Sequence, residues 1–345
     1  MTAHAREAGS ATLARLVESV RQAHAEGVAL RIVGGDTKRA WWSTAARHVL
    51  SLAEHRGIVD YAPSELVVVA RAGTPLVEIE EALAARGQML GFEPPRTGDG
   101  STIGGVIAAG IAGPARPYLG AVRDFVLGVK VLDSSGEVLS FGGRVMKNVA
   151  GYDVSRLFAA SWGRLGPIVE VALRATPIPP RTTTLRWRSN EHDAWQRLRG
   201  FARQPLPISG CRQVDGHLDL RLAGAAAAID DACARLRPEA VEEMPDAWAR
   251  WRDLADPNLQ AARWRVVVPP ATPPLSGDCV AWDWGGALRW YGGPPPADAV
   301  REAGGHGAPF PEGLSHPNLE PALRALTERV REAFDPHRLF NPVST

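Results

Sequence analysis

The chain has 345 residues and a net charge of +1; 45% of its residues are apolar and 22% are charged. This composition is typical of a globular protein of two or three domains. The near-zero net charge excludes a broad positive field that would attract nucleic acid or an anionic membrane surface. We expect a cytoplasmic protein, because the N-terminal residues lack the apolar core of a secretory signal and no apolar run approaches the ~20 residues of a membrane-spanning helix.

The cysteines and histidines indicate no metal centre. Cys211, Cys233 and Cys279 are scattered and form no C-x-x-C pair, which favours reduced thiols and argues against an iron–sulfur cluster or a structural zinc site. Histidines in the second half also stand apart, without the spacing of metal ligands, among them His217, His306, His316 and His337. A lone histidine is more often a surface or core residue than a ligand, so we expect no metal.

The first half predicts helices and strands in alternation. Apolar residues at helical spacing predict a helix over 11–26. A second helix is expected over 74–86, where Thr74 can cap, Pro75 suits the first position and Gly87 stops the helix. Strands are expected over 29–33, 65–71, 125–133 and 168–173, with 138–141 as the hairpin partner of 125–133.

The prolines of TPIPPR, at 176–181, cannot continue a strand or a helix, so we place a domain boundary there. Beyond it, strands are expected over 185–187, 218–222, 265–268 and 287–291, and helices over 192–203 and 224–236. This mixture predicts an α+β domain. A last helix has one apolar face and ends at Phe334-Asp335-Pro336; its apolar residues are Leu319, Leu323, Leu326 and Val330.

Two glycine clusters precede the hairpin. The first, VGGDTK at 33–38, follows a strand, and its freed backbone N–H groups can form a nest for phosphate. No Walker pattern occurs, and an ordinary strand-to-loop turn is the alternative. The second, PPRTGDGSTIGG at 94–105, departs from the Rossmann spacing and lacks the preceding strand, so a Rossmann fold is excluded. Its hydroxyls and glycines still suit a pyrophosphate; a packed glycine-rich helix is the alternative.

The third cluster spans 142–177 and combines Arg144 and Lys147 with a GYD turn, a WGRLGP turn and a strand. Between the second and third clusters lie Arg116, Arg123 and Asp124. Arginine can bind phosphates through two parallel hydrogen bonds, although a single arginine is more often a solvated surface charge. Each cluster alone is weak evidence for a phosphate site, and their order along the chain is the stronger signal.

In this order, GGDTK, RTGDGSTIGG and MKNVAGYDVSRLF resemble the FAD-binding domain of the vanillyl-alcohol-oxidase (PCMH) type. FDPHRLFNP resembles the end of FAD-linked oxidases, and EPPRTGDG, VMKNVAGYDVSRL and DWGGALRW resemble the family of FAD-binding E components of bacterial glycolate oxidases. The resemblance implies a PCMH-type domain of two α+β subdomains over 1–178. It also implies an α+β cap domain over 179–330, which would dock a substrate or a partner chain, and a segment over 331–345 that returns to the flavin domain.

The resemblance also implies where FAD binds. The pyrophosphate is expected against 34–38 and 98–105, the adenine end beside Ile168 and Val169, and the isoalloxazine near the 147–152 segment and Asn341. The expected FAD-binding residues are Gly34, Gly35, Asp36, Thr37, Lys38, Thr97, Gly98, Asp99, Ser101, Thr102, Gly104, Gly105, Arg116, Arg123, Asp124, Lys147, Asn148, Tyr152, Ile168, Val169 and Asn341. Many relatives link a histidine of the first loop to the flavin; 33–39 contains no histidine or cysteine, so we expect noncovalent FAD.

By the same resemblance, the chain is the FAD-binding subunit of a complex that oxidises glycolate, a 2-hydroxy acid, to glyoxylate. Its partners would be a related flavin-binding D component and an iron–sulfur F component, which could hold the complex at the inner face of the membrane. Because this chain lacks the cysteines for a cluster, its electrons would leave to O2, a quinone or a partner, and the resemblance favours a partner. We expect Arg289 to hold the substrate carboxylate and His306 to act as the base. On the alternative view, Arg289 simply alternates outward on its strand and His306 is solvated.

Two further functions stay open at this point. The chain could be a noncatalytic accessory subunit in which FAD only stabilises the fold. It could also be a stand-alone FAD-dependent oxidoreductase with a different substrate.

Overall fold

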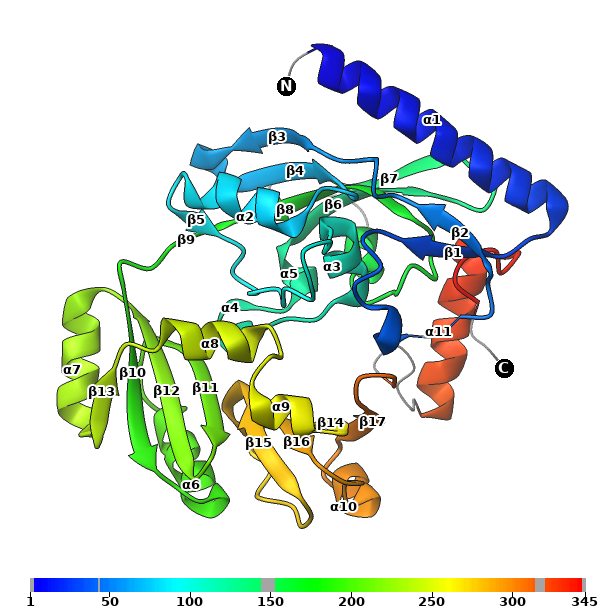
Figure 1. Ribbon diagram of the computed structural model, residues 1–345. Helices are drawn as coiled ribbons and strands as arrows, with labels where there is room; N and C mark the ends of the chain where they lie inside the picture. The colour runs from blue at the N-terminus through cyan, green and yellow to red at the C-terminus, as the bar shows by residue number, and fades with distance from the viewer. Residues whose placement is uncertain (1–2, 43, 144–152, 314–319, 343–345) are drawn as a thin grey trace.

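The computed structural model describes residues 3–42, 44–143, 153–313 and 320–342 (Figure 1). Within these ranges, no helix is both long and apolar enough to cross a membrane. The first part of the chain contains helices α1 (Ala3–Glu26), α2 (Leu76–Ala84), α3 (Ile103–Ala109), α4 (Arg116–Leu119) and α5 (Val122–Phe125). Its strands are β1 (Leu30–Val33), β2 (His48–Ser51), β3 (Ile58–Ala62), β4 (Val67–Arg71), β5 (Gln88–Met89), β6 (Val126–Leu132), β7 (Val138–Gly142), β8 (Ile168–Arg174) and β9 (Thr176–Pro177).

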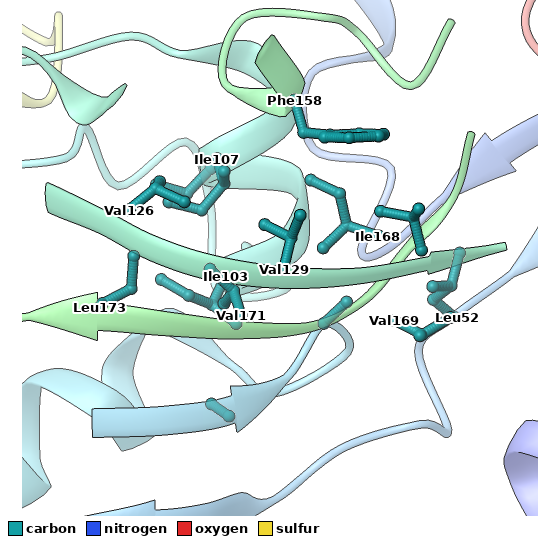
Figure 2. Packing of buried hydrophobic residues seen from close by; sticks show 14 of the residues in the cluster. Leu52, Ile103, Ile107, Val126, Val129, Phe158, Ile168, Val169, Val171 and Leu173 are labelled. Carbon is teal, nitrogen blue, oxygen red and sulfur yellow. The ribbon is translucent and has the colours of Figure 1, made fainter. Parts of the chain in front are cut away.

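The first part contains three sheets, the smallest of which is the antiparallel pair of β5 and β9. β1 and β2 form a parallel pair, and β3-β4-β8-β6-β7 form an antiparallel sheet in that order. The residues of β4 are all buried, as its VVVAR sequence predicts. Apolar residues of α3, β6 and β8 meet in one core, and Figure 2 shows Ile107, Val129 and Val171 within it. This core holds α3 against the sheet and so positions the glycine-rich loop that precedes α3.

The second part carries one antiparallel sheet of eight strands. Its strands are β10 (Arg181–Arg188), β11 (Ile208–Val214), β12 (His217–Gly224), β13 (Ala240–Glu242), β14 (Trp264–Val267), β15 (Cys279–Asp283), β16 (Leu288–Tyr291) and β17 (His306–Pro309). They lie in the order β13-β10-β12-β11-β15-β16-β14-β17. Its helices are α6 (Glu191–Phe201), α7 (Ala226–Leu236), α8 (Pro245–Arg252), α9 (Pro257–Ala261) and α10 (Ala297–Glu302). Trp187, Trp251, Trp282 and Trp290 are buried, so these tryptophans are core residues.

The predicted helices and strands are found, with shifted ends. The helix predicted over 11–26 begins earlier, at Ala3. The helix predicted from Thr74 begins at Leu76 because Thr74 Oγ1 is used by the preceding turn, donating to Arg71 O and accepting from Gly57 N. The sequence did not predict β11, in which Gly210 and Arg212 interrupt the apolar pattern.

The C-terminal helix α11 (Pro321–Phe334) returns to the first part (Figure 1). Its end packs through Phe334 against Phe158, with ring centroids 5.4 Å apart, and the next residues run beside β1. The predicted boundary at residue 330 therefore falls inside α11. The predicted apolar face is only partly covered, since Leu323 and Leu326 are 50% and 52% exposed; Leu319 lies outside the described residues.

The two parts contact each other through polar groups. Arg221 Nη2 on β12 donates to both carboxylate oxygens of Glu93 at 2.8 Å. Trp284 Nε1 donates to the carbonyl oxygen of Gly113 at 3.0 Å. These contacts fix the eight-stranded sheet against the segments that precede and follow α3.

Candidate functional site

A cleft opens beside β1, α3 and the returning C-terminus. Ten predicted FAD-binding residues line it: Gly34, Gly35, Asp36, Thr37, Lys38, Thr102, Gly104, Gly105, Ile168 and Asn341. The residues that were not predicted are Ile32, Val33, Trp42, Leu52, Ala72, Ala108, Ala109, Trp162 and Gly163. Most of these are apolar. Val33, in VGGDTK, and Trp162 and Gly163, in the WGRLGP turn, belonged to motifs that the sequence singled out.

The first two glycine clusters pack directly on each other. A Cβ atom on Gly35 would lie 1.6 Å from the carbonyl oxygen of Gly100, and one on Gly34 would lie 2.1 Å from Thr102 Oγ1. Thr37 and Thr97 also share a hydrogen bond of 2.9 Å between their hydroxyls. Glycine is therefore required at Gly34 and Gly35 because the two loops approach closely, and the joined loops form one wall of the cleft.

Gly104 has a different role from the one predicted. The sequence suggested that it leaves room for phosphates, but a Cβ atom there would lie 2.5 Å from the Cβ of Ala72. Gly104 thus lets α3 approach the turn after β4. At Gly105, a Cβ atom would meet only Thr102 Oγ1 within 4 Å, at 3.3 Å. Gly105 is the glycine of this pair that leaves space on the cleft side.

Lys38 places a cation in the wall of the cleft. Its side chain is buried, and Nζ donates to Thr97 Oγ1 at 3.0 Å and to Ser101 Oγ at 3.4 Å. Among the described residues, no carboxylate pairs with it, because the nearby Asp36 pairs with Arg31 at 2.9 Å. Burial lowers the pKa of Lys38 to about 8. A buried ammonium group with hydroxyl partners alone fits an anionic ligand, such as a diphosphate.

Asn341 closes the cleft from the C-terminal side. Its Oδ1 accepts a hydrogen bond from Ile32 N at 2.8 Å, and its Nδ2 donates to Trp162 O at 2.7 Å. The side chain therefore ties β1, the WGRLGP turn and the C-terminal segment together. Its predicted place at the site agrees with the geometry, but its amide is occupied by main-chain partners.

Several predicted residues lie away from the cleft lining. Arg123 is exposed, and Asp124 caps α5 by accepting from Ala121 N at 2.8 Å. The hydroxyls of Thr97 and Ser101 accept hydrogen bonds from Lys38. Gly98 and Asp99 are exposed in the second loop. Val169 is buried behind Ile168 in the core. Lys147, Asn148 and Tyr152 lie outside the described residues.

Three basic residues of the predicted site lie outside the lining of the cleft. Arg116 stacks on Trp284 at 4.2 Å, where the two parts meet, and does not line the cleft. Arg289 is fully buried and donates to the carbonyl oxygens of Gly286, Pro273 and Thr272, so each of its three nitrogens already has a main-chain partner. His306 is exposed on β17, and partial burial with the charges of Arg265 and Arg116 lowers its pKa.

The described residues contain no group of three or more side chains that could hold a metal ion. No histidine or cysteine lines the part of the cleft that the structure describes. Cys211 is buried, Cys233 and Cys279 are half-buried, and all three are free thiols.

Comparison with known proteins identifies related chains. An FAD binding domain family matches residues 10–142. Glycolate oxidase subunit GlcE of Escherichia coli (strain K12) is 40% identical over 337 residues, which cover 95% of each chain. Glycolate oxidase subunit GlcD of Bacillus subtilis (strain 168) is 32% identical over 138 residues, or 40% of this chain and 29% of that one.

More distant relatives share part of the sequence or only the fold. A D-2-hydroxyglutarate dehydrogenase of Xanthomonas citri pv. viticola is 36% identical over 169 residues, or 48% of this chain and 35% of that one. A solved structure of alkyldihydroxyacetonephosphate synthase matches with a TM-score of 0.63 at 13% identity, covering 95% of this chain and 74% of that one. This last likeness shows the fold alone. The predicted α+β fold with an FAD-binding domain is confirmed, and the chain belongs to the family of glycolate oxidase subunit GlcE.

Proposed function

We propose that this chain is the FAD-binding subunit of a multi-subunit glycolate oxidase. The observation that carries the proposal is the buried Lys38 ammonium in a glycine-walled cleft, within the region that matches an FAD binding domain. The relatives named for glycolate oxidase, GlcE and GlcD, support a complex that contains more than one related flavin-binding chain. An iron–sulfur protein, the F component, belongs to the same proposal as the third partner.

The residues of the cleft fit FAD in two zones. Lys38, with the hydroxyls of Thr37 and Thr102, would hold the diphosphate through charge-assisted hydrogen bonds. The apolar wall formed by Ile32, Leu52, Ala108, Ala109, Trp162 and Ile168 would take the rings. When bound, FAD supplies a two-electron acceptor for oxidation of a 2-hydroxy acid. Binding would be noncovalent, a proposal that the histidine-free and cysteine-free lining of the described cleft supports.

A second function, that of an accessory subunit, is favoured by the positions of two predicted substrate-binding residues. Arg289 and His306, predicted to hold and deprotonate the substrate, are both absent from the lining of the cleft. An accessory subunit with a structural flavin would need neither residue. A ligand present at 100 times its dissociation constant stabilises a fold by about 2.7 kcal/mol, which is enough for such a role.

The test uses the full chain, alone and together with its partner subunits. We expect a visible flavin spectrum, and we expect acid precipitation to release the flavin into the supernatant. A flavin that stays in the pellet would contradict noncovalent binding, and absence of flavin from both preparations would contradict the proposal. Anaerobic glycolate should bleach the flavin if this subunit oxidises the acid. A bound flavin that glycolate leaves unchanged, even in the complex, would establish the accessory role.

A further inference from the structure

An open groove lies beside the start of β10, where the chain enters the second part of the molecule. The groove has a volume of about 510 Å³, within the range of roughly 300–1,000 Å³ that is typical of ligand-binding pockets. Its lining includes Glu93, Thr182, Arg221, Glu243, Trp248 and Arg252. Among the described residues, none lines both this groove and the FAD-binding cleft, so the groove is a separate site.

The groove lies at a place where the eight-stranded sheet is incomplete. β13 is the edge strand of this sheet, and it pairs only with residues 184–186 of β10 (Figure 1). After Glu242 the chain leaves the sheet, and α8 begins at Pro245. Residues 181–183 of β10 therefore have β12 on one side and the groove on the other.

The main chain of Thr182 faces the groove and not β12. Opposite residues of an antiparallel pair either exchange hydrogen bonds or both turn away from each other. Thr182 lies opposite Ala223 of β12, and Ala223 N donates to Pro207 O on the far side, next to β11. The main chain of Thr182 therefore also turns away, toward the edge of the sheet. Arg186 has the same direction, since its carbonyl oxygen accepts from Glu239 N at 3.0 Å. Because β13 ends before it reaches Thr182, this N–H and C=O have no strand partner within the described residues.

Two arginines of the groove each keep one nitrogen for a further acceptor. Arg221 Nε donates to Ser209 Oγ and its Nη2 donates to Glu93. Arg252 donates to Asp253 through Nε and Nη2. In both side chains, Nη1 has no acceptor within the part of the chain that the structure describes. Because a carboxylate already neutralises each guanidinium, the remaining N–H groups suit a neutral acceptor, such as a peptide carbonyl, better than a second anion.

The remaining charge and the apolar surface define the segment that fits. Glu243 is exposed, and of the charged residues in the described lining it is the one without an ion pair, since the arginines and Glu93 are paired. A basic side chain on the bound segment would complement it. Trp248 is held in place by a bond from Nε1 to Thr184 Oγ1 at 2.9 Å, and its ring and Met244 offer apolar contact.

We propose that an extended segment of a partner chain binds in this groove, pairs with the main chain of Thr182 as an added strand, and places a basic side chain against Glu243. Adding a strand to the edge of a sheet is a recurring way to bind an extended peptide. The inference rests on the proposed function for the existence of a partner chain. Because Glu93 belongs to the first part, the bound segment contacts both parts of the molecule.

The test measures the affinity of the full chain for the related flavin-binding D component, alone and together with the iron–sulfur F component, by biolayer interferometry. Thr182→Pro removes the N–H at the edge of the sheet and leaves the hydrogen bonds between β10 and β12 in place. We expect affinity to fall about tenfold or more, the scale of one or two lost hydrogen bonds. Thr182→Val keeps the N–H, is the matched control, and should bind within about twofold of the wild type.

A second variant tests the charge. Glu243→Lys should weaken assembly several-fold, and added salt should reduce the difference from the wild type. Its matched control is Glu302→Lys, which changes an exposed acid on α10 and should assemble as the wild type does. Wild-type affinity in Thr182→Pro would overturn the added strand, and wild-type affinity in Glu243→Lys would overturn the basic side chain. If Thr182→Pro does not fold, as judged by circular dichroism, Glu243→Lys and hydrogen exchange decide.

Hydrogen exchange on the assembled complex locates the contact. We expect slower exchange over residues 181–184 and 243–249 in the complex than in the chain alone. Unchanged exchange over 181–184 would overturn the proposal. Sedimentation of the chain alone tests the other occupant, a second copy of this chain. A monomer supports a different partner, whereas a dimer that Thr182→Pro dissociates would overturn that assignment in favour of a second copy.

The flavin spectrum, recorded on every variant, separates this proposal from the proposed function. Retained flavin with lost assembly in Thr182→Pro supports the docking groove. Assembly that depends on Thr182 in a chain that takes up no flavin would preserve the groove and contradict the cofactor proposal. A flavin-loaded wild-type chain that does not assemble with either component would overturn the groove and leave the cofactor proposal standing.

Discussion

At the scale of single residues, Lys38 shows how a short loop produces a binding site. Glycines at 34 and 35 let the loop lie against Gly100, and this contact buries Lys38 beside Thr97 and Ser101. Burial costs the ammonium part of its hydration, which is why its pKa falls from 10.5 to about 8. A diphosphate would restore the lost favourable interaction.

The first prediction concerns pH and Lys38. Because a bound diphosphate favours the charged ammonium, FAD affinity should be constant below about pH 7 and fall as the pH rises above 8, by at most about tenfold per unit. The Lys38→Met variant should bind FAD more weakly and lose this pH dependence, while Lys38→Arg should bind at high pH. Flavin fluorescence titrations from pH 6 to 10 measure the effect, and a wild-type profile that stays flat would contradict it.

Without flavin, the free energy of unfolding should rise with pH, which is opposite to the predicted fall in FAD affinity. Between the folded pKa of about 8 and the ordinary value of 10.5, the unfolded chain binds more protons at Lys38 than the folded chain does. The contribution of Lys38 to the free energy of unfolding therefore rises with pH across this window and falls as the pH drops through 8. Lys38→Met serves as the control that lacks this contribution.

At the scale of elements, the C-terminal return depends on one carboxylate. Asp335 follows α11, and its two oxygens accept hydrogen bonds from Leu339 N at 2.8 Å and Phe340 N at 2.9 Å. Arg331 adds a bond from Nη2 to Phe340 O at 3.3 Å. These contacts turn the chain so that Leu339 O accepts from Leu30 N and Asn341 reaches the cleft.

The second prediction tests this turn. Asp335→Asn should lower the free energy of unfolding by about 1–3 kcal/mol, because the amide presents a donor to one of two buried N–H groups. FAD affinity should fall as well, since Asn341 loses its position. The exposed Asp298, paired with Arg301 on α10, provides the control: Asp298→Asn should change stability by less than about 1 kcal/mol. Urea unfolding measures both variants, and equal losses would refute the assigned role.

At the scale of the whole molecule, the two parts are joined by polar contacts that include an ion pair and a hydrogen bond. Arg221 stacks on Trp248 at 4.9 Å and pairs with Glu93 from the first part. Arg96 N donates to Asp253 Oδ1 at 2.9 Å. The position of the eight-stranded sheet relative to the first part therefore depends in part on a mostly buried ion pair.

The third prediction concerns that ion pair. Glu93→Gln leaves a buried arginine without its counter-charge, so we expect a loss of about 3–5 kcal/mol. Calorimetry should then show the two parts unfolding less cooperatively than in the wild type. Asp230→Asn, which breaks the exposed Arg181 pair, should leave the transition unchanged. A Glu93→Gln transition that matches the wild type would show that other contacts hold the parts together.

The sequence by itself determined the α+β class, the order of most helices and strands, and the loops that meet at the cleft. Glycine spacing, capping residues and apolar periodicity are local properties, so they are readable along the chain. Ten residues of the cleft were predicted, because the motifs that carry them resemble those of an FAD-binding family. The apolar lining, such as Ala108 and Leu52, carries no such signal, because any core contains similar residues.

Only the tertiary structure decided what individual side chains do once the elements pack. Arg289 and Arg265 lie in strands of similar composition, yet one meets three carbonyl groups and the other stacks on the Trp284 ring. Likewise, a Cβ atom added to Gly104 would point at Ala72, while one added to Gly105 would point toward the cleft. Strand register and the contact between the two parts set these directions. Both depend on residues far apart in the chain, and no local pattern contains that information.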